Sequence, residues 1–577
     1  MLIQARAFDA ATGDFDTQLD PLLKRIYQAR GITDSTALER KLSCLPAPSV
    51  MQGIPAAVAL LVSSLKQQQR VLIVGDFDAD GATSSALMVL ALTAMGYQQV
   101  DFLVPNRFDY GYGLTPEIVD LALEKAPDLI ITVDNGISSI EGVAHANKLG
   151  IQVIVTDHHL PGAILPDAAA IVNPNQPGCD FPTKNLAGVG VAFYLLSALR
   201  AELRKQDWFA QFGITEPNMA SWLDLVALGT VADVVPLDQV NRALVYQGLM
   251  RIRAGKCRPG IQALLTIAGK SAHSLVATDL GFALGPRLNA AGRLDDISLG
   301  IQCLLTNDHQ QAMLGAQQLD ELNQDRKLIE QGMQREALAI VEKIPLSLDG
   351  EVPVALCLFQ PEWHQGVVGL LASRIKEKYN RPVVAFARGD GGQLKGSSRS
   401  IPGLHIRDAL DAVATQNPGL ITKFGGHAMA AGLSLDEDKL AAFEEAFQTQ
   451  VEKTLDEDDL LARMVTDGEL HCHQLSMPTA QLLRDGGPWG QQFPEPCFEG
   501  LFQLKQQRIV GEKHLKLVLA HESEPNRGID GICFNVDTEE WPNYRAETVR
   551  CVYRLDINEY RGLEKLQLLI QHIELIN

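Results

Sequence analysis

The stretch VLIVGDFDADG, residues 71–81, decides the fold of this chain. Its first five residues are apolar or small, which predicts a buried strand, and three alternating aspartates lead into an apolar run that predicts a helix from Ala82 to Met95. The same alternation then repeats, with strands expected at 100–104, 129–133 and 151–156 and helices at 116–125 and 139–149. Apolar strands separated by helices predict an α/β fold with a parallel sheet covered on both faces.

The chain has 577 residues, too many for one core. From about residue 308 to 344 there is no proline and apolar residues recur at helical spacing, which predicts a long helix that connects two domains or lies inside one large core. A second α/β pattern begins at Val352, and apolar and polar residues alternate after about Met464, which predicts an antiparallel β domain. The expected segments are an N-terminal extension (1–60), an α/β domain (61–305), a connector helix (306–345), a second α/β domain (346–455) and a β domain (460–577).

The composition is that of a folded protein, and its charge restricts how it binds nucleic acid. Lys and Arg total 50 and Asp and Glu total 70, so the net charge is −20, which excludes binding by bulk positive charge but leaves a local basic groove or a bound metal. The nine cysteines form no Cys-x-x-Cys pair, as is typical of free thiols in a reducing compartment. With no secretory signal and no apolar run long enough for a membrane span, we expect a cytoplasmic protein without membrane attachment.

Acidic residues, in one case followed by two histidines, come directly after three of the expected strands. They are Asp76, Asp78 and Asp80 after the first, Asp134 after another, and Asp157, His158 and His159 after the last. Because the carboxyl ends of parallel strands share one crevice, we expect these groups to converge, and their mutual repulsion requires a cation. Carboxylates with imidazoles and no thiolate favour Mg²⁺ or Mn²⁺ over zinc, and the number of ligands indicates two ions, an arrangement that hydrolyses phosphoesters.

Other interpretations of the short motifs fail. A calcium loop of the EF-hand type would need Glu at position 87, where the chain has Leu87. Ala268-Gly-Lys270-Ser271 lacks the first glycine of a phosphate-binding loop, and Gly188-Val-Gly190 meets Phe193 where a dinucleotide-binding turn needs a small residue. His471-Cys472-His473 has no second ligand cluster nearby and is interpreted as structural. ATPase and dehydrogenase functions are therefore excluded at these positions.

Taken together, the motifs resemble the DHH phosphoesterase superfamily. The resemblance rests on Asp76-Phe-Asp78-Ala-Asp80-Gly, Asp134-Asn-Gly, Asp157-His158-His159 and Ala227-Leu-Gly-Thr-Val-Ala-Asp233. Four further motifs are similar to those of the superfamily's single-stranded-DNA-specific exonucleases: Gly285-Pro-Arg287-Leu-Asn289, Trp363-His364-Gln-Gly366, Lys395-Gly-Ser397-Ser398-Arg399 and Gly425-Gly426-His427. The resemblance implies a DHH catalytic domain at 61–305, a DHH-associated domain at 346–455 and an OB-like nucleic-acid-binding domain at 460–577.

The resemblance also implies roles for the acidic residues and histidines. One ion would be held by Asp76, Asp78 and Asp134, and the other by Asp80, Asp134, His158 and Asp233, so that Asp134 bridges the two. Asp157 would lie next to the ligands without binding either ion, and His159 would contact the scissile phosphate.

A second set of residues is implied to bind the substrate. It comprises Ser397 and Arg399 at the 5′ phosphate, Gly425, Gly426 and His427 lining the cleft, and Arg287 and Asn289. Arg107 fits a further phosphate contact because guanidinium binds phosphate through two parallel hydrogen bonds, although a surface arginine in a loop is the alternative. In the β domain, basic residues at 505, 508, 513, 514 and 516 are expected either to track a nucleic-acid backbone or to be ordinary solvated charges.

The resemblance implies a single-stranded-DNA-specific 5′→3′ exonuclease that releases mononucleotides with two divalent cations, Mn²⁺ or Mg²⁺, in DNA repair and recombination. Its expected partners are single-stranded DNA, single-strand-binding protein and repair helicases, and we expect a monomer. The alternative is a DHH-type phosphodiesterase that acts on short oligonucleotides or cyclic dinucleotides. A non-catalytic strand-binding protein is disfavoured because the ligand set is intact.

Overall fold

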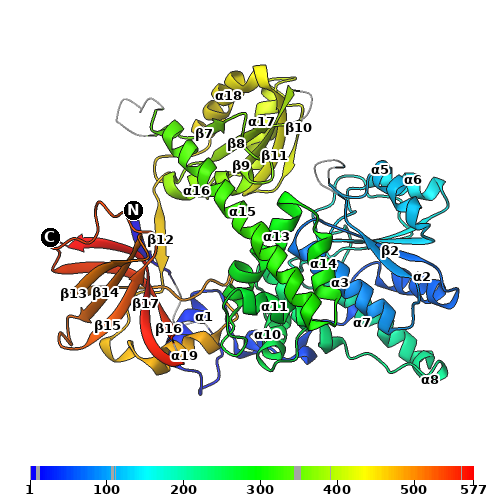
Figure 1. The fold of residues 1–577 in the computed structure, drawn as a ribbon, viewed down its shortest axis with the longest axis horizontal. Coiled ribbons are helices and arrows are strands. Elements are labelled where there is room, and N and C mark those ends of the chain that lie inside the picture. Colours follow the sequence, from blue (N-terminus) through cyan, green and yellow to red (C-terminus); the bar gives the residue numbers. More distant parts are fainter. Residues whose placement is uncertain are drawn as a thin grey trace. The chain divides into compact units, whose positions relative to one another are not determined.

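The structure is a computed structural model that describes residues 2–7, 13–105, 110, 112–343, 352–389, 392–560 and 562–576 (Figure 1). The chain forms two compact units, which are described separately. The smaller unit comprises Met1–Gln4 and Glu321–Met464, and the larger comprises Ala5–Asp320 and Val465–Asn577. The finer division into five segments stays a prediction.

The larger unit contains the parallel sheet that the sequence predicts. Its strands are β2 (Val71–Gly75), β3 (Val100–Leu103), β4 (Leu129–Val133), β5 (Gln152–Thr156) and β6 (Ala170–Val172). They lie in the order β3-β2-β4-β5-β6, and every neighbouring pair is parallel. The chain therefore runs from β2 outward to β3 and then returns to the other side of β2. Such a reversal in strand order opens a crevice at the carboxyl ends of the strands.

Helices cover the sheet on both faces (Figure 1). They are α2 (Ile54–Lys66), α3 (Ala79–Ala94), α5 (Pro116–Ala122), α6 (Ile140–Lys148) and α7 (Gly188–Lys205), and the short α8 (Trp208–Gln211) contacts α7. Alternate strand residues such as Leu72, Val74 and Ile130 pack with α5 and α6 in one buried cluster, while α3 and α7 contact β2, β4 and β5. Helix α3 begins three residues earlier than expected because Asp78 caps its first turn, which places Asp80 inside the helix.

The remaining helices of this part of the chain follow in sequence. They are α9 (Leu223–Ala232), α10 (Gln239–Arg253), α11 (Pro259–Ile267), α12 (Ala277–Asp279), a π-helix (Leu280–Leu284), α13 (Gly285–Leu294) and α14 (Ser298–Leu305). Helix α9 packs against α3 and α10, and α13 contacts both α3 and α9. The helices α9 and α13, which are distant in sequence from β2, therefore pack against α3, the helix that follows the carboxyl end of β2.

The β domain is a closed barrel, as an OB-like domain requires. Its strands are β13 (Phe498–Val510), β14 (His514–His521), β15 (Gly528–Cys533), β16 (Thr548–Tyr560) and β17 (Leu563–Ile576), preceded by α19 (Met477–Gly486). The domain is antiparallel, as expected, in four of its five strand pairs, and the fifth pair, β15 and β17, is parallel. Five strands in a closed ring cannot all alternate in direction, so closure forces at least one parallel pair.

The N-terminal extension is anchored to the segment that leads into the barrel. Helix α1 (Pro21–Gln28) carries Tyr27, whose hydroxyl donates to Gly486 O at 2.8 Å, and Arg30 forms two hydrogen bonds with the Asp467 carboxylate. Within the described residues no single helix could cross a membrane by length and apolar character, and one bent pair, Leu42–Val50 with Ile54–Lys66, passes only when taken together.

The long helix is α15 (His309–Val341), which confirms the helix expected at 306–345 except at its ends, and residues 344–345 lie outside the described residues. The boundary between the two units falls within this helix. The smaller unit then adds β7 (Leu356–Phe359), α16 (Val368–Tyr379), β8 (Val383–Arg388), β9 (Gln393–Arg399), α17 (Ile406–Gln416), β10 (Lys423–Gly426), β11 (Ala430–Asp436) and α18 (Leu440–Glu452). Its sheet has the order β10-β11-β9-β8-β7, and β1 (Leu2–Ala5) pairs with β12 (Arg463–Thr466).

Candidate metal centre

The loop after β2 presents its aspartates in different ways. Asp78 is the N-cap of α3, and its Oδ1 accepts hydrogen bonds from Asp80 N at 2.9 Å and Gly81 N at 3.1 Å. The Asp80 carboxylate instead accepts from Gly188 N at 2.6 Å and Val189 N at 2.9 Å, at the N-terminus of α7. Free N–H groups at a helix N-terminus favour an anion, so α7 fixes Asp80 while leaving lone pairs on both oxygens.

Asp134 lies at a backbone position that is strained for a residue with a side chain. Its φ of 62° is in the left-handed region, and the next residue, Asn135, holds the turn by donating to Val74 O at 3.1 Å and Val133 O at 2.9 Å. The side chain is buried against Gly188, where an added Cβ would lie 2.7 Å from Asp134 Cβ. The turn thereby directs the Asp134 carboxylate into the crevice.

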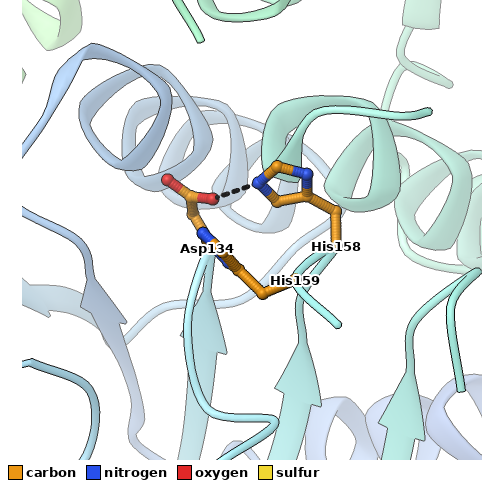
Figure 2. Close-up of side chains that lie close together, drawn as sticks. All are labelled: Asp134, His158 and His159. Carbon is orange, nitrogen blue, oxygen red and sulfur yellow. Dashed lines mark ion pairs between the residues drawn. The ribbon is translucent and has the colours of Figure 1, made fainter. Parts of the chain in front are cut away.

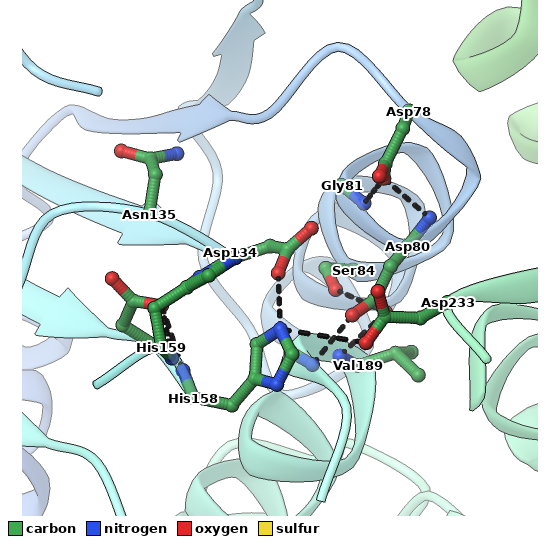
Figure 3. A network of polar contacts seen from close by, with 12 residues as sticks. Asp78, Asp80, Gly81, Ser84, Asp134, Asn135, His158, His159, Val189 and Asp233 are labelled. Atoms are coloured by element: carbon green, nitrogen blue, oxygen red, sulfur yellow. Dashed lines mark hydrogen bonds and ion pairs between the residues drawn. The ribbon is translucent and has the colours of Figure 1, made fainter. Parts of the chain in front are cut away.

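His158 and Asp233 complete the cluster from two further elements (Figures 2 and 3). His158 follows β5, and its Nε2 lies 3.1 Å from Asp134 Oδ1 and 3.4 Å from Asp233 Oδ2. Asp233 is the C-cap of α9, which packs on α3, the helix that carries Asp80. Asp80 and Asp233, which are separated by more than 150 positions in sequence, are therefore within a side chain's reach of His158, as the resemblance implies.

The donors group into sets that suit metal ions. Within each set, one ligand atom per residue lies within 4.8 Å of the others; the sets are Asp76, Asp78 and Asp134; Asp80, His158 and Asp233; and Asp134, His158 and His159. Asp134 Oδ1, His158 Nε2 and Asp233 Oδ2 are buried yet have no hydrogen-bond partner among the described residues. Oxygen and imidazole donors about 3 Å apart match neighbouring ligands of one hard cation at about 2.1 Å, so the residues present fit Mg²⁺ or Mn²⁺.

Electrostatics in the crevice also favour a bound cation. Burial, and after it the charge of Asp233, raises the pKa of Asp80 to about 7, and burial with the charge of Asp78 raises the pKa of Asp233 to about 7. Burial and the charge of Asp80 hold the pKa of Asp134 well above its usual range. Three carboxyl groups therefore resist ionising together, and a divalent cation would remove that penalty.

The Asp157 carboxylate is hydrogen-bonded to protein groups through both of its oxygens. Its Oδ1 accepts from His158 N, His159 N and His159 Nδ1 at 2.7, 3.0 and 2.8 Å, and its Oδ2 accepts from Ile137 N at 2.9 Å. Although burial alone would lower the pKa of His159, the hydrogen bond and charge of Asp157 raise it to about 9. The pair thus sets His159 as a cation beside the ligands.

The other substrate residues expected in this unit make contacts of their own. Asn289 Oδ1 accepts from Ala79 N at 2.7 Å, so it braces the loop that carries Asp78 and Asp80. Arg287 pairs with Asp320 at 2.8 Å. Direct contact of either residue with DNA stays a prediction, and Arg107 lies outside the described residues.

The smaller unit brings its predicted residues together on one sheet. The register aligns Ser397 with Gly432 and Gly432 with Gly425, so glycines extend a side-chain-free shelf from Ser397. Arg399 donates from Nη1 to Ser397 Oγ at 3.2 Å and from Nε to Ser373 Oγ at 3.1 Å. A Cβ at Gly425 would meet nothing within 4 Å, so the shelf is open.

Gly426 and His427 lie at one end of the shelf, where β10 turns into β11. Gly426 has a φ of 146° and aligns with Ala431 in β11. The next residue, His427, donates its backbone N–H to Ala430 O at 2.8 Å. The predicted set in this unit is therefore contiguous.

Some contributors were not predicted from the sequence. Gly188 was considered only as part of a nucleotide-binding turn, whereas its N–H binds Asp80. Tyr112 is a second such residue: its hydroxyl donates to Asp134 O at 3.2 Å and lies 3.2 Å from His159 Nδ1. The sequence signal for Gly188 is its position: it is a glycine at the start of an expected helix that comes after the last of the strands followed by acidic residues.

We expect divalent cations to stabilise the protein more at pH 8 than at pH 6. In the metal-free site, the pKa values of Asp80 and Asp233 are raised from 3.8 to about 7, so stability present below about pH 4 is lost as pH rises to about 7. Protons and cations compete for the same oxygens, so Mn²⁺ affinity should fall about tenfold or more from pH 8 to pH 6. The measurement is the rise in melting temperature when Mn²⁺ is added to EDTA-treated protein, and an equal rise at both pH values would contradict the raised pKa values.

Three family models match the chain. They are "DHH family, N-terminal domain" at residues 70–230, "DHHA1 domain" at residues 351–453 and "RecJ OB domain" at residues 466–572. The chain is 56% identical to single-stranded-DNA-specific exonuclease RecJ of Escherichia coli (strain K12), over 97% of each chain. It is 52% identical to the protein of the same name from Haemophilus influenzae, over 96% of each chain.

Solved structures are similar over most of the chain. RecJ from Thermus thermophilus in complex with Mn²⁺ has a TM-score of 0.77 and 30% identity, covering 97% of this chain and 76% of that chain. The structure of the same protein with Mg²⁺ has a TM-score of 0.72 and 28% identity, covering 97% and 75%.

Proposed function

Because the chain belongs to the RecJ family of single-stranded-DNA-specific exonucleases, we propose that it degrades single-stranded DNA from the 5′ end and releases mononucleotides. It is a metal-dependent hydrolase of phosphodiester bonds, and its cofactor is Mn²⁺ or Mg²⁺. The single observation that supports the mechanism is the convergence of Asp134, His158 and Asp233 with the aspartates of the loop after β2.

We assign the cation ligands as the resemblance to the DHH superfamily implies. One cation would be held by Asp76, Asp78 and Asp134, and the other by Asp80, Asp134, His158 and Asp233. The clustering of the first three, and of Asp80 with His158 and Asp233, supports this assignment, and the 3.1 Å contact of His158 with Asp134 supports adding Asp134 to the second set. When bound, the cations supply an activated water nucleophile and stabilise the charge that builds up on the scissile phosphate.

The neighbouring side chains perform the remaining tasks. Asp157 orients His159 by a 2.8 Å hydrogen bond and, through its charge, keeps the ring protonated. A protonated imidazole donates a charge-assisted hydrogen bond to a phosphate oxygen, so His159 is assigned to the scissile phosphate. In the smaller unit, Arg399 and Ser397 are assigned to the 5′-terminal phosphate, with Gly425, Gly426 and His427 forming the shelf.

The barrel offers a groove for the single strand. It is about 660 Å³ in volume and is lined by Lys505, Arg508 and Lys516 with Tyr544, whose side chain is 82% exposed. Arg508 and Lys516 lie opposite each other across β13 and β14. Positive charges beside an exposed aromatic ring suit a phosphate backbone with stacked bases. The other two basic residues expected to track DNA, Lys513 and His514, are not among the lining residues.

We expect the triple change Lys505→Ala, Arg508→Ala and Lys516→Ala to weaken binding of long single strands and to flatten its salt dependence. Each lost phosphate contact reduces the slope of log affinity against log salt by about 0.7, so three contacts reduce it by about 2. The measurement is fluorescence anisotropy of a labelled strand across a salt series in EDTA.

The matched control removes three exposed lysines elsewhere, by Lys205→Ala, Lys256→Ala and Lys453→Ala. The net charge changes by the same amount, so a purely global effect would flatten both slopes equally. That outcome would overturn the assignment of the groove.

The function is tested on single strands labelled at the 5′ end, with Mn²⁺ or Mg²⁺. We expect labelled mononucleotide from the first turnover and no such product from duplex DNA, from protein in EDTA, or from the Asp80→Ala and His158→Ala variants. Release of label only after the strand has been shortened from the 3′ end would overturn the polarity. Preference for dinucleotides or cyclic dinucleotides in a chain-length series would favour the alternative phosphodiesterase.

We further propose that the enzyme acts as a monomer in the cytoplasm, with single-strand-binding protein and repair helicases as partners. All nine cysteines are free, which supports a reducing compartment. Light scattering of the purified protein, alone and with single-strand-binding protein, tests the oligomeric state and the partnership.

A further inference from the structure

One aromatic residue, on the segment that packs against the end of α9, is largely exposed to solvent. Phe282 is 83% exposed, while its neighbours Leu280 and Leu284 are fully buried. Single exposed apolar residues are common and need no explanation by themselves, so the support of this ring decides whether it has a role.

The support is the π-helix Leu280–Leu284, which leads directly into α13. The buried leucines at both ends anchor the segment to the core and leave Phe282 on its outer side. Single turns of π-helix are rare and occur frequently at functional sites because they displace one side chain from the regular helical face. The Phe282 ring is therefore presented from a fixed segment rather than from a loose loop.

The π-helix is fitted closely to the helix that carries a metal ligand. A Cβ added at Gly281 would lie 3.2 Å from Val231 Cγ1, and one added at Gly285 would lie 3.1 Å from Ala232 Cβ. These contacts involve the last two residues of α9, immediately before Asp233. Glycines on both sides of Phe282 thus allow the segment to approach the end of α9.

The following helix, α13, is fitted to the aspartate loop. A Cβ at Gly292 would overlap Phe77 O at 1.7 Å, and Asn289 holds Ala79 N. The helical segment that carries Phe282 therefore packs against two elements that supply metal ligands. One is α9, whose C-cap is Asp233, and the other is the loop after β2. A ring on this element keeps a fixed position relative to the ligands.

We propose that Phe282 is a base-stacking residue that positions a nucleotide of the single strand beside the metal centre. This inference rests on the proposed function, because the group that would stack on Phe282 is an unpaired base of the single-stranded DNA substrate. A single strand presents exposed π faces, and stacking on aromatic side chains tolerates any base sequence. Stacking on a rigid ring would fix the base and, through it, the position of the scissile phosphate.

The first experiment compares Phe282→Ala with Phe282→Tyr and Phe282→Leu. We expect Phe282→Ala to raise KM for a single strand about tenfold, with a smaller change in kcat, since one base–aromatic stack accounts for about that factor. Phe282→Tyr keeps the π face and should restore KM, whereas Phe282→Leu should restore it only in part. Binding measured in EDTA, where no cleavage occurs, should follow the same order.

The second experiment moves a single abasic nucleotide along the strand from its 5′ end. At one position the wild type should lose about as much affinity as Phe282→Ala loses on the intact strand, and the variant should lose nothing more there. Equal losses in wild type and variant at every position would overturn the proposal, as would an intact-strand affinity of Phe282→Ala equal to that of wild type.

The matched control is Phe212→Ala, which removes an exposed ring that packs on Trp208 at α8. It should leave KM unchanged, and both variants should melt within a degree or two of wild type. The outcomes separate the two proposals: strand binding that depends on Phe282 without release of nucleotides contradicts the exonuclease function alone, and nucleotide release unaffected by Phe282→Ala contradicts the stacking role alone.

Discussion

Replacing Asp134 with asparagine is expected to lower exonuclease activity by about three orders of magnitude or more, and to raise the melting temperature of the metal-free protein. Asp134 is assigned to both cations, so its loss should affect both, each of which contributes several kcal/mol to the transition state. Without metal, burial and the charge of Asp80 raise its pKa strongly, so ionised Asp134 is a cost to the folded state. Asparagine keeps the shape of the side chain and removes that charge.

The two effects are measured on the same preparation. Activity is followed as mononucleotide release in Mn²⁺, and melting is followed in EDTA and again after Mn²⁺ is added. Asp180→Asn, at an exposed position, is the matched control and should change neither quantity. An Asp134→Asn protein with at least a tenth of wild-type activity would refute the bridging role. A lower melting temperature in EDTA would show that the contact of the carboxylate with His158 outweighs its repulsion by the neighbouring aspartates.

The convergence of the metal ligands could be predicted because it depends only on strand order and direction. Asp76, Asp134 and Asp157 each follow a mostly apolar strand, and parallel strands place their carboxyl ends at one edge. Neither the helix that delivers Asp233 nor the distances between the donors could be obtained this way. Asp233 was found through the resemblance, and its place depends on how α9 packs against α3, which is decided by side-chain fit.

Features set by backbone geometry were the hardest to anticipate. The left-handed φ of Asp134 and the two bonds of Asn135 that hold it do not follow from composition or spacing. The same applies to Gly188, which was rejected as part of a nucleotide-binding turn and yet supplies an N–H to Asp80. The π-helix before α13 also lies in a pattern that reads as ordinary helix. In each case a tertiary contact selects the local conformation.

The barrel illustrates a different limit. Alternating apolar and polar residues correctly predicted strands such as β16, because the alternation reflects one buried and one solvated face. Strand pairing is not contained in that alternation, which does not reveal the parallel pairing of β15 with β17 inside an otherwise antiparallel domain. Closure of the five-stranded ring, a property of all its strands together, requires one such pair.

Replacing Arg399 with glutamine is expected to reduce kcat/KM on 5′-phosphorylated strands by roughly 10- to 100-fold, which is the loss of one charge-assisted phosphate contact. Strands with a 5′ hydroxyl should be affected much less, so the preference for the phosphate should largely disappear. Arg399 is held in place by Ser397 and Ser373, and burial lowers its pKa without making it neutral at physiological pH. Arg399→Lys should recover only part of the loss, because an ammonium group cannot form the bidentate contact.

A second variant tests the same site without breaking any contact of the folded protein. Gly425→Val adds a side chain where a Cβ would meet no atom within 4 Å, so we expect unchanged stability but a reduced preference for a 5′ phosphate. Gly332→Ala in α15 is its control, since a Cβ there also meets nothing; it should raise stability slightly through helix propensity and leave the preference intact. If Gly425→Val kept the full 5′-phosphate preference, as the control does, while Arg399→Gln lost it, the arginine would act without the glycine shelf. If Arg399→Gln kept the preference as well, the terminal phosphate would bind elsewhere in the protein.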